Sequence, residues 1–350
     1  MTNAAIEHDA STALAAHQLI LDASRLRASD IHIEPLRDYC RIRFRIDSLL
    51  YEHATLPTWQ GTRIITHLKL LSELNIAEKR LPQDGRLYHA LTPTQTLSLR
   101  VSTCPHHLGE KMVLRLFNTA EKFLTLADCG FLPEQLDVMQ ASLRTESGII
   151  LITGPTGSGK TTTLYAALMA LNTLEKNIIT IEDPIEMEIN GITQVNIHSR
   201  IGLTFENALR AFLRQDPDVI LIGEIRDAET ANIAMQAAQT GHLVLASLHT
   251  INAASARARL NTLGMTDHTA IHLIIAQRLL RKPCVHCHAQ GCAHCHQGYV
   301  GQTGVFECLQ PNITHTPTLT LFNAGLSKCQ RGETTHEELQ RVLGAAHAVL

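Results

Sequence analysis

The stretch GIILITGPTGSGKTT, residues 148–162, decides the fold of this chain. Its first seven residues are apolar or small and predict a buried strand. Residues 154–162, which share Gly154 with that run, fit the pattern G-x-x-x-x-G-K-[S/T], which forms a phosphate-binding loop where it lies between a strand and a helix. The pattern therefore predicts a site for nucleotide phosphates, formed by Gly154, Pro155, Thr156, Gly157, Ser158, Gly159, Lys160, Thr161 and Thr162.

Each residue type in this loop has a physical task. Glycines let backbone N–H groups turn inward around phosphate oxygens, and the following helix adds the dipole of its N-terminus. Lys160 brings a positive charge to the β- and γ-phosphates, and the Thr161 hydroxyl can bind Mg²⁺. A nucleoside triphosphate with Mg²⁺ is the expected ligand.

Three further apolar runs predict strands that accompany this loop. They are NIITIED (177–183), DVILIGE (218–224) and HLVLASL (242–248). Strands that are apolar throughout are buried on both faces, which is typical of a mostly parallel sheet. Helical periodicity between them, at 204–215 and 227–240, supports an α/β fold.

Carboxylates stand at the ends of two of these strands. Glu182 and Asp183 end the first run, and Glu224 ends the second. A carboxylate beside a phosphate loop can hold Mg²⁺ through water or orient the attacking water. Spacing alone leaves the roles of the two glutamates open. His249 follows the third run and could contact the γ-phosphate, or it could be an ordinary core histidine.

The first third of the chain has a different pattern. Residues 39–46 alternate strictly and predict a half-buried strand with a basic face, while 97–103 and 110–117 predict two more strands. Helices are expected over 11–28 and 60–76. This segment predicts a smaller α+β domain.

The domain boundaries follow from these patterns. We expect an N-terminal domain over 1–117, a linker over 118–130 and a phosphate-loop domain over 131–350. Near the C-terminus, 315–321 predicts a loop and 334–349 a helix.

Composition limits the classes of protein that fit. Of 350 residues, 45% are hydrophobic and 18% are charged, which excludes a disordered chain. The net charge of −3 and the 4% of aromatic residues count against a nucleic-acid-binding protein. No apolar run is long enough to cross a bilayer, and Glu7 and Asp9 do not suit a signal peptide. We expect a cytoplasmic protein.

Four of the nine cysteines are clustered in the pattern C-x2-C-x4-C-x2-C. Two C-x-x-C pairs suit a tetrahedral, structural Zn²⁺ site, although the four-residue spacer is shorter than is usual. A metal-free turn is the alternative, and the spacing of iron–sulfur clusters is not matched. The site would anchor the segment after a helix expected to end near Arg281. Its ligands would be Cys284, Cys287, Cys292 and Cys295.

These motifs, in this order, resemble the secretion ATPase superfamily, and more narrowly the type II secretion and type IV pilus assembly ATPases. The family's Walker A motif matches 154–162, its aspartate box TIEDPIE (180–186), its Walker B motif ILIGEIRD (220–227) and its histidine box GHLVLASLHT (241–250). The N-terminal motifs ASDIHIEP, RIRFRID and RLPQDGR match as well. The resemblance implies a RecA-like domain preceded by a PAS-like one.

The resemblance also implies an activity. Such proteins form hexameric rings that hydrolyse ATP, act on an inner-membrane platform protein and thereby move pilin-like subunits. It implies that Glu182 activates water, that Glu224 is the Walker B glutamate beside Mg²⁺, and that His249 senses phosphate. It further implies cytoplasmic placement at the membrane through the partner, and no direct contact with nucleic acid.

Three departures from the family pattern matter. RIDSLLYE places Ser48 and Tyr51 where the family often has Gly and Arg, so Arg63 becomes the best candidate for a phosphate-contacting arginine, ahead of Arg43 and Arg45. Only about 23 residues precede the match, so we expect no additional N-terminal docking domain, as in ATPases of DNA-uptake pili. The cysteine module is also shorter.

Other functions remain open at this point. A pilus retraction ATPase is an alternative within the family, but its members lack the cysteine module. A nucleic-acid-binding zinc protein would conflict with the net charge. A ring scaffold without catalysis would conflict with the intact Lys160, Thr161, Glu182 and Glu224.

Overall fold

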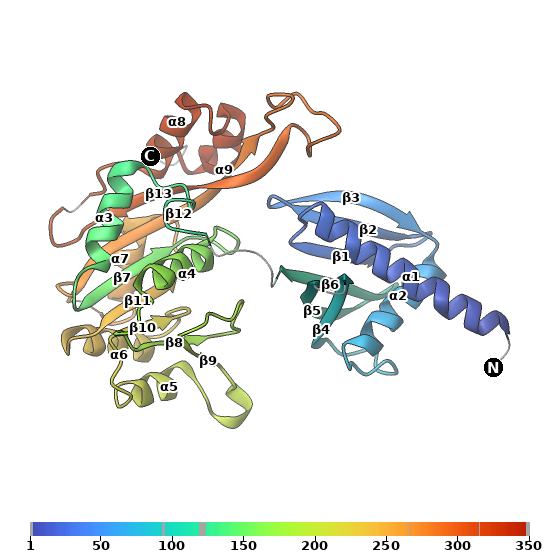
Figure 1. The fold of residues 1–350 in the computed structure, drawn as a ribbon, viewed down its shortest axis with the longest axis horizontal. Helices are drawn as coiled ribbons and strands as arrows, with labels where there is room; N and C mark the ends of the chain where they lie inside the picture. Colours follow the sequence, from blue (N-terminus) through green and yellow to red (C-terminus); the bar gives the residue numbers. More distant parts are fainter. Residues whose placement is uncertain (1–2, 93–94, 119–123, 266, 315, 348–350) are drawn as a thin grey trace. The chain divides into compact units, whose positions relative to one another are not determined.

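The computed structural model describes residues 3–92, 95–118, 124–265, 267–314 and 316–347. The chain divides into two compact units, Met1–Glu121 and Lys122–Leu350 (Figure 1). Residues 119–123 of the predicted linker lie outside the described residues, whereas Leu126 and Cys129 of the same segment are buried in the core of the second unit. Within the described residues, every helix is too short or too polar to cross a membrane.

The first unit contains a six-stranded antiparallel sheet with the strand order β3-β2-β1-β6-β5-β4. The predicted alternation of 39–46 is confirmed, because every second residue of β2 from Cys40 to Ile46 is buried. The strands are β1 (Asp30–Pro35), β2 (Cys40–Ile46), β3 (Leu49–Leu56), β4 (Gln83–Thr92), β5 (Gln95–His106) and β6 (Gly109–Asn118).

Two helices, α1 (Asn3–Arg25) and α2 (Thr58–Leu71), share an apolar core with this sheet. The predicted helix over 60–76 is wrong beyond Leu71. Glu73 has a φ of 57°, and the N–H of Leu74 bonds the carbonyl of Lys69 across the helix end. Helix α1 stops three residues before the predicted end because Arg27 has a positive φ.

The second unit is built on a seven-stranded sheet with the order β13-β12-β7-β11-β10-β8-β9. All its pairs are parallel except β12 with β13, which confirms the expected mostly parallel α/β sheet. The strands are β7 (Gly148–Thr153), β8 (Ile178–Glu182), β9 (Thr193–Asn196), β10 (Val219–Ile222), β11 (Leu243–Leu248), β12 (Ile271–Pro283) and β13 (Tyr299–Leu309).

Helices cover both faces of this sheet (Figure 1). Apolar side chains of α3 and α4 form the core on one face, and those of α5, α6, α7, α8 and α9 form the core on the other. The helices are α3 (Pro133–Leu143), α4 (Lys160–Leu171), α5 (Phe205–Phe212), α6 (Ala228–Gln239), α7 (Ala253–Thr262), α8 (Leu321–Gln330) and α9 (His336–His347), with a short 3-10 turn at Ser199–Ile201.

The expectation of a helix ending near Arg281 is wrong, because that segment is strand β12. It pairs in parallel with β7 and antiparallel with β13. Its apolar residues are buried in the cores on both faces of the sheet. A run that is apolar on both faces shows neither the alternation of a half-buried strand nor the stripe of an amphipathic helix. Its periodicity therefore does not distinguish a strand from a buried helix. Strand β13 has no counterpart in the predicted pattern.

The parallel register brings several strand ends to one edge of the sheet. Leu248 pairs with Thr153, and Ile222 pairs with Ala246 and Ile181. The residues that follow these strands therefore gather beside the phosphate loop.

Candidate functional site

The phosphate loop joins β7 to α4 through glycines that no other residue can replace. Gly159 is the N-cap of α4 with a φ of 85°, in the left-handed region. A Cβ atom on Gly154 would lie 2.5 Å from Ser158 Oγ and 2.6 Å from the carbonyl oxygen of Gln277. The chain therefore needs glycine at both positions.

Lys160 is buried under this loop. Its Nζ donates hydrogen bonds to the carbonyl oxygens of Gly154 and Pro155, at 2.8 and 3.2 Å. Burial lowers the pKa of Lys160 to about 8, although the nearby Glu224 opposes the change. The Lys160 ammonium is thus bound to carbonyl groups of the loop itself, next to the place where phosphate oxygens would lie.

His249 lies between Lys160 and Glu224. Its Nδ1 is 3.5 Å from Lys160 Nζ, and its Nε2 is 3.4 Å from Glu224 Oε2. An ammonium can only donate and a carboxylate can only accept, so a neutral imidazole with its proton on Nε2 satisfies both contacts. Burial and the charge of Lys160 lower the pKa of His249, which favours this neutral form.

Glu224 is tied on its other side to an arginine. Arg226 donates to Glu224 Oε1, and its Nη1 lies 3.6 Å from Asp183 Oδ2. Lys160, His249, Glu224, Arg226 and Asp183 thus form a continuous chain of polar contacts beside the phosphate loop.

Glu182 lies in a separate, buried network. It is 4% exposed and accepts hydrogen bonds from Tyr165 at Oε2 and from Thr180 and Gln194 at Oε1. The two candidate glutamates therefore have different surroundings: Glu224 contacts charged groups at the loop, and Glu182 contacts neutral donors under α4.

Two threonines fix the backbone next to His249, and sequence patterns did not single them out. Thr153 Oγ1 lies 2.7 Å from Thr250 Oγ1 and accepts the N–H of Thr250 at 2.9 Å. The pair joins the end of β7 to the end of β11, which places His249 opposite Lys160.

A buried carboxylate supports the segment after His249. Glu307 on β13 accepts the backbone N–H of Ala253, the first residue of α7, at 2.9 Å. Its other oxygen accepts the N–H of Leu321, the first residue of α8, at 3.1 Å. One side chain therefore caps two helices.

The remaining loop residues suit a phosphate ligand. Ser158 Oγ is buried without a hydrogen-bond partner among the described residues, whereas Thr161 and Thr162 are exposed at the start of α4. Pro155, Thr156 and Gly157 are also exposed. A buried hydroxyl in such a loop suits a hydrogen bond to a phosphate oxygen.

The three candidate arginines belong to the first unit and differ in their contacts. Arg43 makes two bonds of 2.8 Å to Glu34, and Arg45 lies 3.7 Å from Asp30. Arg63 is exposed on α2, stacks over the Trp59 ring at 5.3 Å, and makes no ion pair with a described residue.

Ser48, which stands where the family often has glycine, has a backbone conformation that is unfavourable for serine. Asp47 and Ser48 form the two-residue turn between β2 and β3, with φ values of 47° and 72°. This is the conformation that glycine adopts most easily, so serine is accommodated here with some strain.

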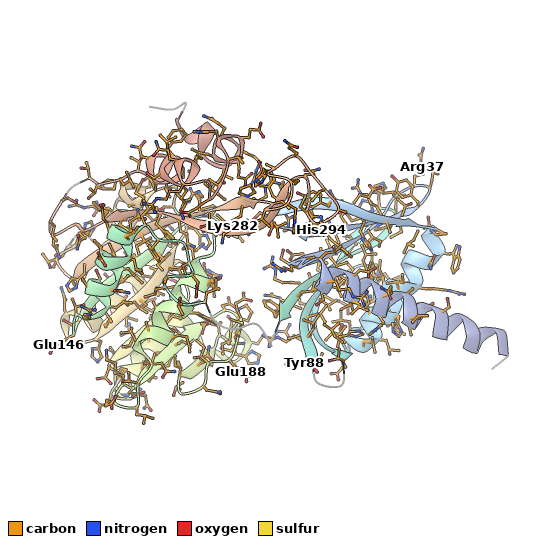
Figure 2. The ribbon with its side chains drawn as sticks, turned by 45° about the horizontal axis from the view of Figure 1, so that its top comes forward. Arg37, Tyr88, Glu146, Glu188, Lys282 and His294 are labelled. Carbon is orange, nitrogen blue, oxygen red and sulfur yellow. The ribbon has the colours of Figure 1, made fainter. Side chains whose placement is uncertain are left out.

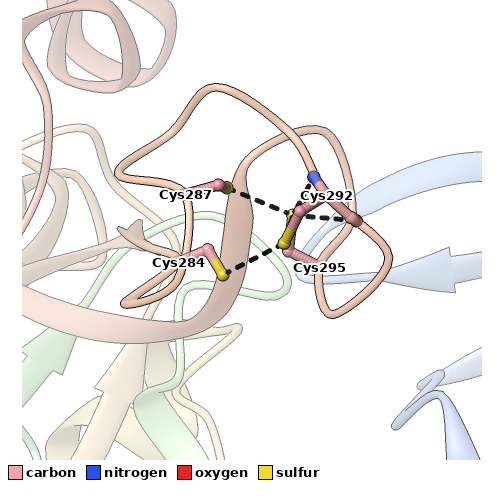
Figure 3. Close-up of side chains that lie close together, drawn as sticks. All are labelled: Cys284, Cys287, Cys292 and Cys295. Atoms are coloured by element: carbon pink, nitrogen blue, oxygen red, sulfur yellow. Dashed lines mark hydrogen bonds between the residues drawn. The ribbon is translucent and has the colours of Figure 1, made fainter.

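The four clustered cysteines meet in space, in the loop between β12 and β13 that contains His294 (Figures 2 and 3). The Sγ atoms of Cys284 and Cys292 are 3.9 Å apart, and Cys295 Sγ lies 3.7 Å from those of both Cys287 and Cys292. Four sulfurs about 2.3 Å from a tetrahedral Zn²⁺ are roughly 3.8 Å apart, so the cluster fits this ion. The four-residue spacer is therefore long enough.

Comparison with known proteins agrees with this architecture. The family described as "Type II/IV secretion system protein" matches residues 6–342. The "Protein transport protein HofB homolog" of Haemophilus influenzae is 47% identical over 94% of this chain and 72% of its own length. The "Type IV pilus assembly ATPase PilB" of Pseudomonas aeruginosa is 39% identical over 95% and 68%, respectively, and the "Type II secretion system protein E" of Klebsiella pneumoniae is 40% identical over 96% and 76%.

Solved structures share the fold. The Legionella pneumophila ATPase DotB superposes with a TM-score of 0.72 at 22% identity, covering 92% of this chain and 93% of that one. The pilus retraction motor PilT, solved with bound ADP, gives 0.63 at 25% identity, with coverage of 93% and 96%.

Proposed function

The chain belongs to the type II/IV secretion system protein family, and we propose that it is an ATP hydrolase that powers the assembly of type IV pilus or type II secretion pseudopilus subunits. The observation that carries this proposal is the phosphate loop with Lys160, His249 and Glu224 gathered at one end of the parallel sheet. The names of the relatives, which include a type IV pilus assembly ATPase and a type II secretion system protein, support a role in assembly.

We assign nucleotide binding to residues 154–162. Backbone N–H groups of the loop and the Lys160 ammonium would hold the phosphates, with Thr161 and Glu224 at the Mg²⁺ position. Mg²⁺ supplies charge neutralisation at the transferring phosphate. His249 would exchange its contact with Lys160 for one with the γ-phosphate, and so report that ATP is present.

The two glutamates receive different roles. Glu224 lies among charged groups beside the loop, which suits a residue that interacts with Mg²⁺. Glu182 follows the family pattern for the carboxylate that activates water, and its burial suits a base kept from bulk solvent.

The proposal also includes an oligomer and a partner protein. A homo-hexameric ring would act on a polytopic platform protein from the cytoplasmic face of the inner membrane, without direct contact with nucleic acid. Arg63 would contribute to ATP turnover as the arginine contacting the phosphates, and its lack of a described ion pair is consistent with this role. Zn²⁺ held by Cys284, Cys287, Cys292 and Cys295 would stabilise the loop between β12 and β13.

Assembly is favoured over retraction by the cysteine cluster, because the family's retraction members lack that module. A DNA-uptake pilus remains the second candidate, since such systems use similar ATPases. Deletion of the gene separates the three: loss of pili or of secreted protein supports assembly, an excess of pili supports retraction, and loss of DNA uptake alone supports competence.

The direct test of the activity uses the purified chain. Glu224→Gln should retain binding of a fluorescent ATP analogue and lose hydrolysis, because the amide keeps the shape of the side chain but not its charge. Glu229→Gln, at an exposed position on α6, is the matched control. A Glu224→Gln protein that hydrolyses ATP at the wild-type rate would contradict the proposed site.

A further inference from the structure

Glu182 is a buried carboxylate that forms no ion pair with any of the described residues. Its partners are Tyr165, which donates to Oε2, and Thr180, which donates to Oε1 at 2.7 Å. Gln194 adds a longer bond of 3.3 Å to Oε1. These donors hold both oxygens of the buried carboxylate in place.

Tyr165 is itself held in one position. The residue is 2% exposed, and its hydroxyl accepts the backbone N–H of Glu186 at 3.3 Å. Burial, followed by the charge of Glu182, raises the pKa of Tyr165 well above its usual value, so the phenol remains a hydrogen-bond donor.

Helix α4 connects this contact to the phosphate loop. Lys160 is the first residue of α4, and Tyr165 lies five residues later on the same helix. A helix is stiff over this distance, so the group that would hold phosphate and the group that holds Glu182 have a fixed separation.

We propose that Tyr165 is a positioning residue for ATP hydrolysis: its hydroxyl orients the Glu182 carboxylate. The inference rests on the proposed role of Glu182 as the base that activates water. It assigns to Tyr165 no contact with the substrate.

The inference predicts a change in kcat without a change in KM. Loss of the Tyr165 hydroxyl leaves the Glu182 carboxylate free to turn away from the attacking water, while the phosphate loop that binds ATP is untouched. A hydrogen bond to a charged group corresponds to a decrease in kcat of roughly 10- to 100-fold.

The experiment measures kcat, KM and the melting temperature of the full chain for Tyr165→Phe, which keeps the ring. The expected result is a lowered kcat with an unchanged KM for ATP. Thr180→Val removes the other hydroxyl donor to Glu182 and should lower kcat in the same way. Tyr299→Phe removes a buried hydroxyl that contacts Thr335 and should leave kcat unchanged.

Three outcomes separate the failures. If Tyr165→Phe keeps the wild-type kcat while Glu182→Gln abolishes turnover, the inference is overturned and the proposed function stands. If Tyr165→Phe raises KM or lowers the melting temperature together with kcat, its role is structural and the inference is again overturned. If Glu182→Gln hydrolyses ATP normally, the role of Glu182 as a base is wrong, and the inference falls with it.

Discussion

Nε2 of His249 lies 3.4 Å from Oε2 of Glu224, while Nδ1 of the same ring lies 3.5 Å from Lys160 Nζ. One imidazole therefore joins the residue proposed to bind phosphate to the residue proposed to act with Mg²⁺. A ligand that takes Lys160 away from the ring changes the surroundings of Glu224 as well.

Removal of the Lys160 ammonium should abolish measurable hydrolysis. The charge would act at the transferring phosphate in a site with little water, where such contacts are typically worth about 100- to 1000-fold in rate. The measurement is steady-state ATP hydrolysis by Lys160→Ala. Lys176→Ala, in the loop after α4, is the control, and a Lys160→Ala protein within a few-fold of wild type would refute the site.

ATP affinity should decrease above pH 8. Lys160 has a pKa of about 8, so it is charged below this pH and becomes neutral above it. Bound phosphates favour the charged form, so affinity is constant at lower pH and then falls by up to about tenfold per unit. Titrations with a fluorescent nucleotide from pH 7 to 9.5 measure this.

Lys160→Arg is the matched control for that titration. Arginine stays charged throughout the range, so its affinity, although weaker, should not change with pH. A wild-type affinity that is flat between pH 7 and 9.5 would contradict the low pKa of Lys160.

Zinc should be present at about one ion per chain. Cys284→Ser and Cys295→Ser should both lose it, and chelation should lower the thermal stability of the loop between β12 and β13 while sparing nucleotide binding. Metal analysis of protein purified without chelator is the measurement. Cys104→Ser, at an exposed cysteine of the first unit, should retain the ion. Wild-type protein without zinc would show that the cluster binds no metal.

Arg63→Ala should reduce turnover far more than ATP binding. If subunits share a site, mixing Arg63→Ala with Lys160→Ala protein restores part of the activity, because one intact site forms from two different defects. If each chain completes its own site, mixing restores none. An unchanged kcat for Arg63→Ala would remove this arginine from the site.

Glu338→Ala should destabilise the second unit by about 3–5 kcal/mol, because it removes the carboxylate that forms an ion pair with the buried Arg281 guanidinium. The Glu338 side chain is 0% exposed and accepts bonds from Arg281 and Arg341. Chemical unfolding measures the loss. Glu337→Ala, one residue earlier and exposed, should change stability little.

The same carboxylate gives stability a pH dependence. Burial alone would raise the pKa of Glu338, but hydrogen bonds from Arg341 and Arg281 outweigh it and lower the pKa. The contribution is therefore complete above the normal carboxyl pKa and is lost as pH falls toward the lowered value. Glu338→Ala should flatten this part of the stability profile.

The core of the second unit could be predicted from the sequence because its strands carry local signals. Residues 148–154 are apolar throughout and end in a glycine-rich loop, a combination that specifies a strand, a turn and a helix together. Strand β12 lacked such a signal, since an apolar run covered on both faces resembles a buried helix.

The polar networks of the site could be predicted only in part. Lys160, Glu182, Glu224 and His249 stand in recognisable motifs, but their partners are set by tertiary packing. Tyr165 is one aromatic residue in an apolar helix, and nothing in its spacing indicates that its hydroxyl meets Glu182. Contacts between residues far apart in sequence require the sheet register, which motifs do not encode.

The double cap at Glu307 has a mechanical consequence. Helix α7 follows the segment that contains His249, and α8 begins the C-terminal helical pair, yet one carboxylate closes the first turn of each. The starts of α7 and α8 are therefore tethered to the same point on β13. A movement of Glu307 would strain the first turn of both helices at once.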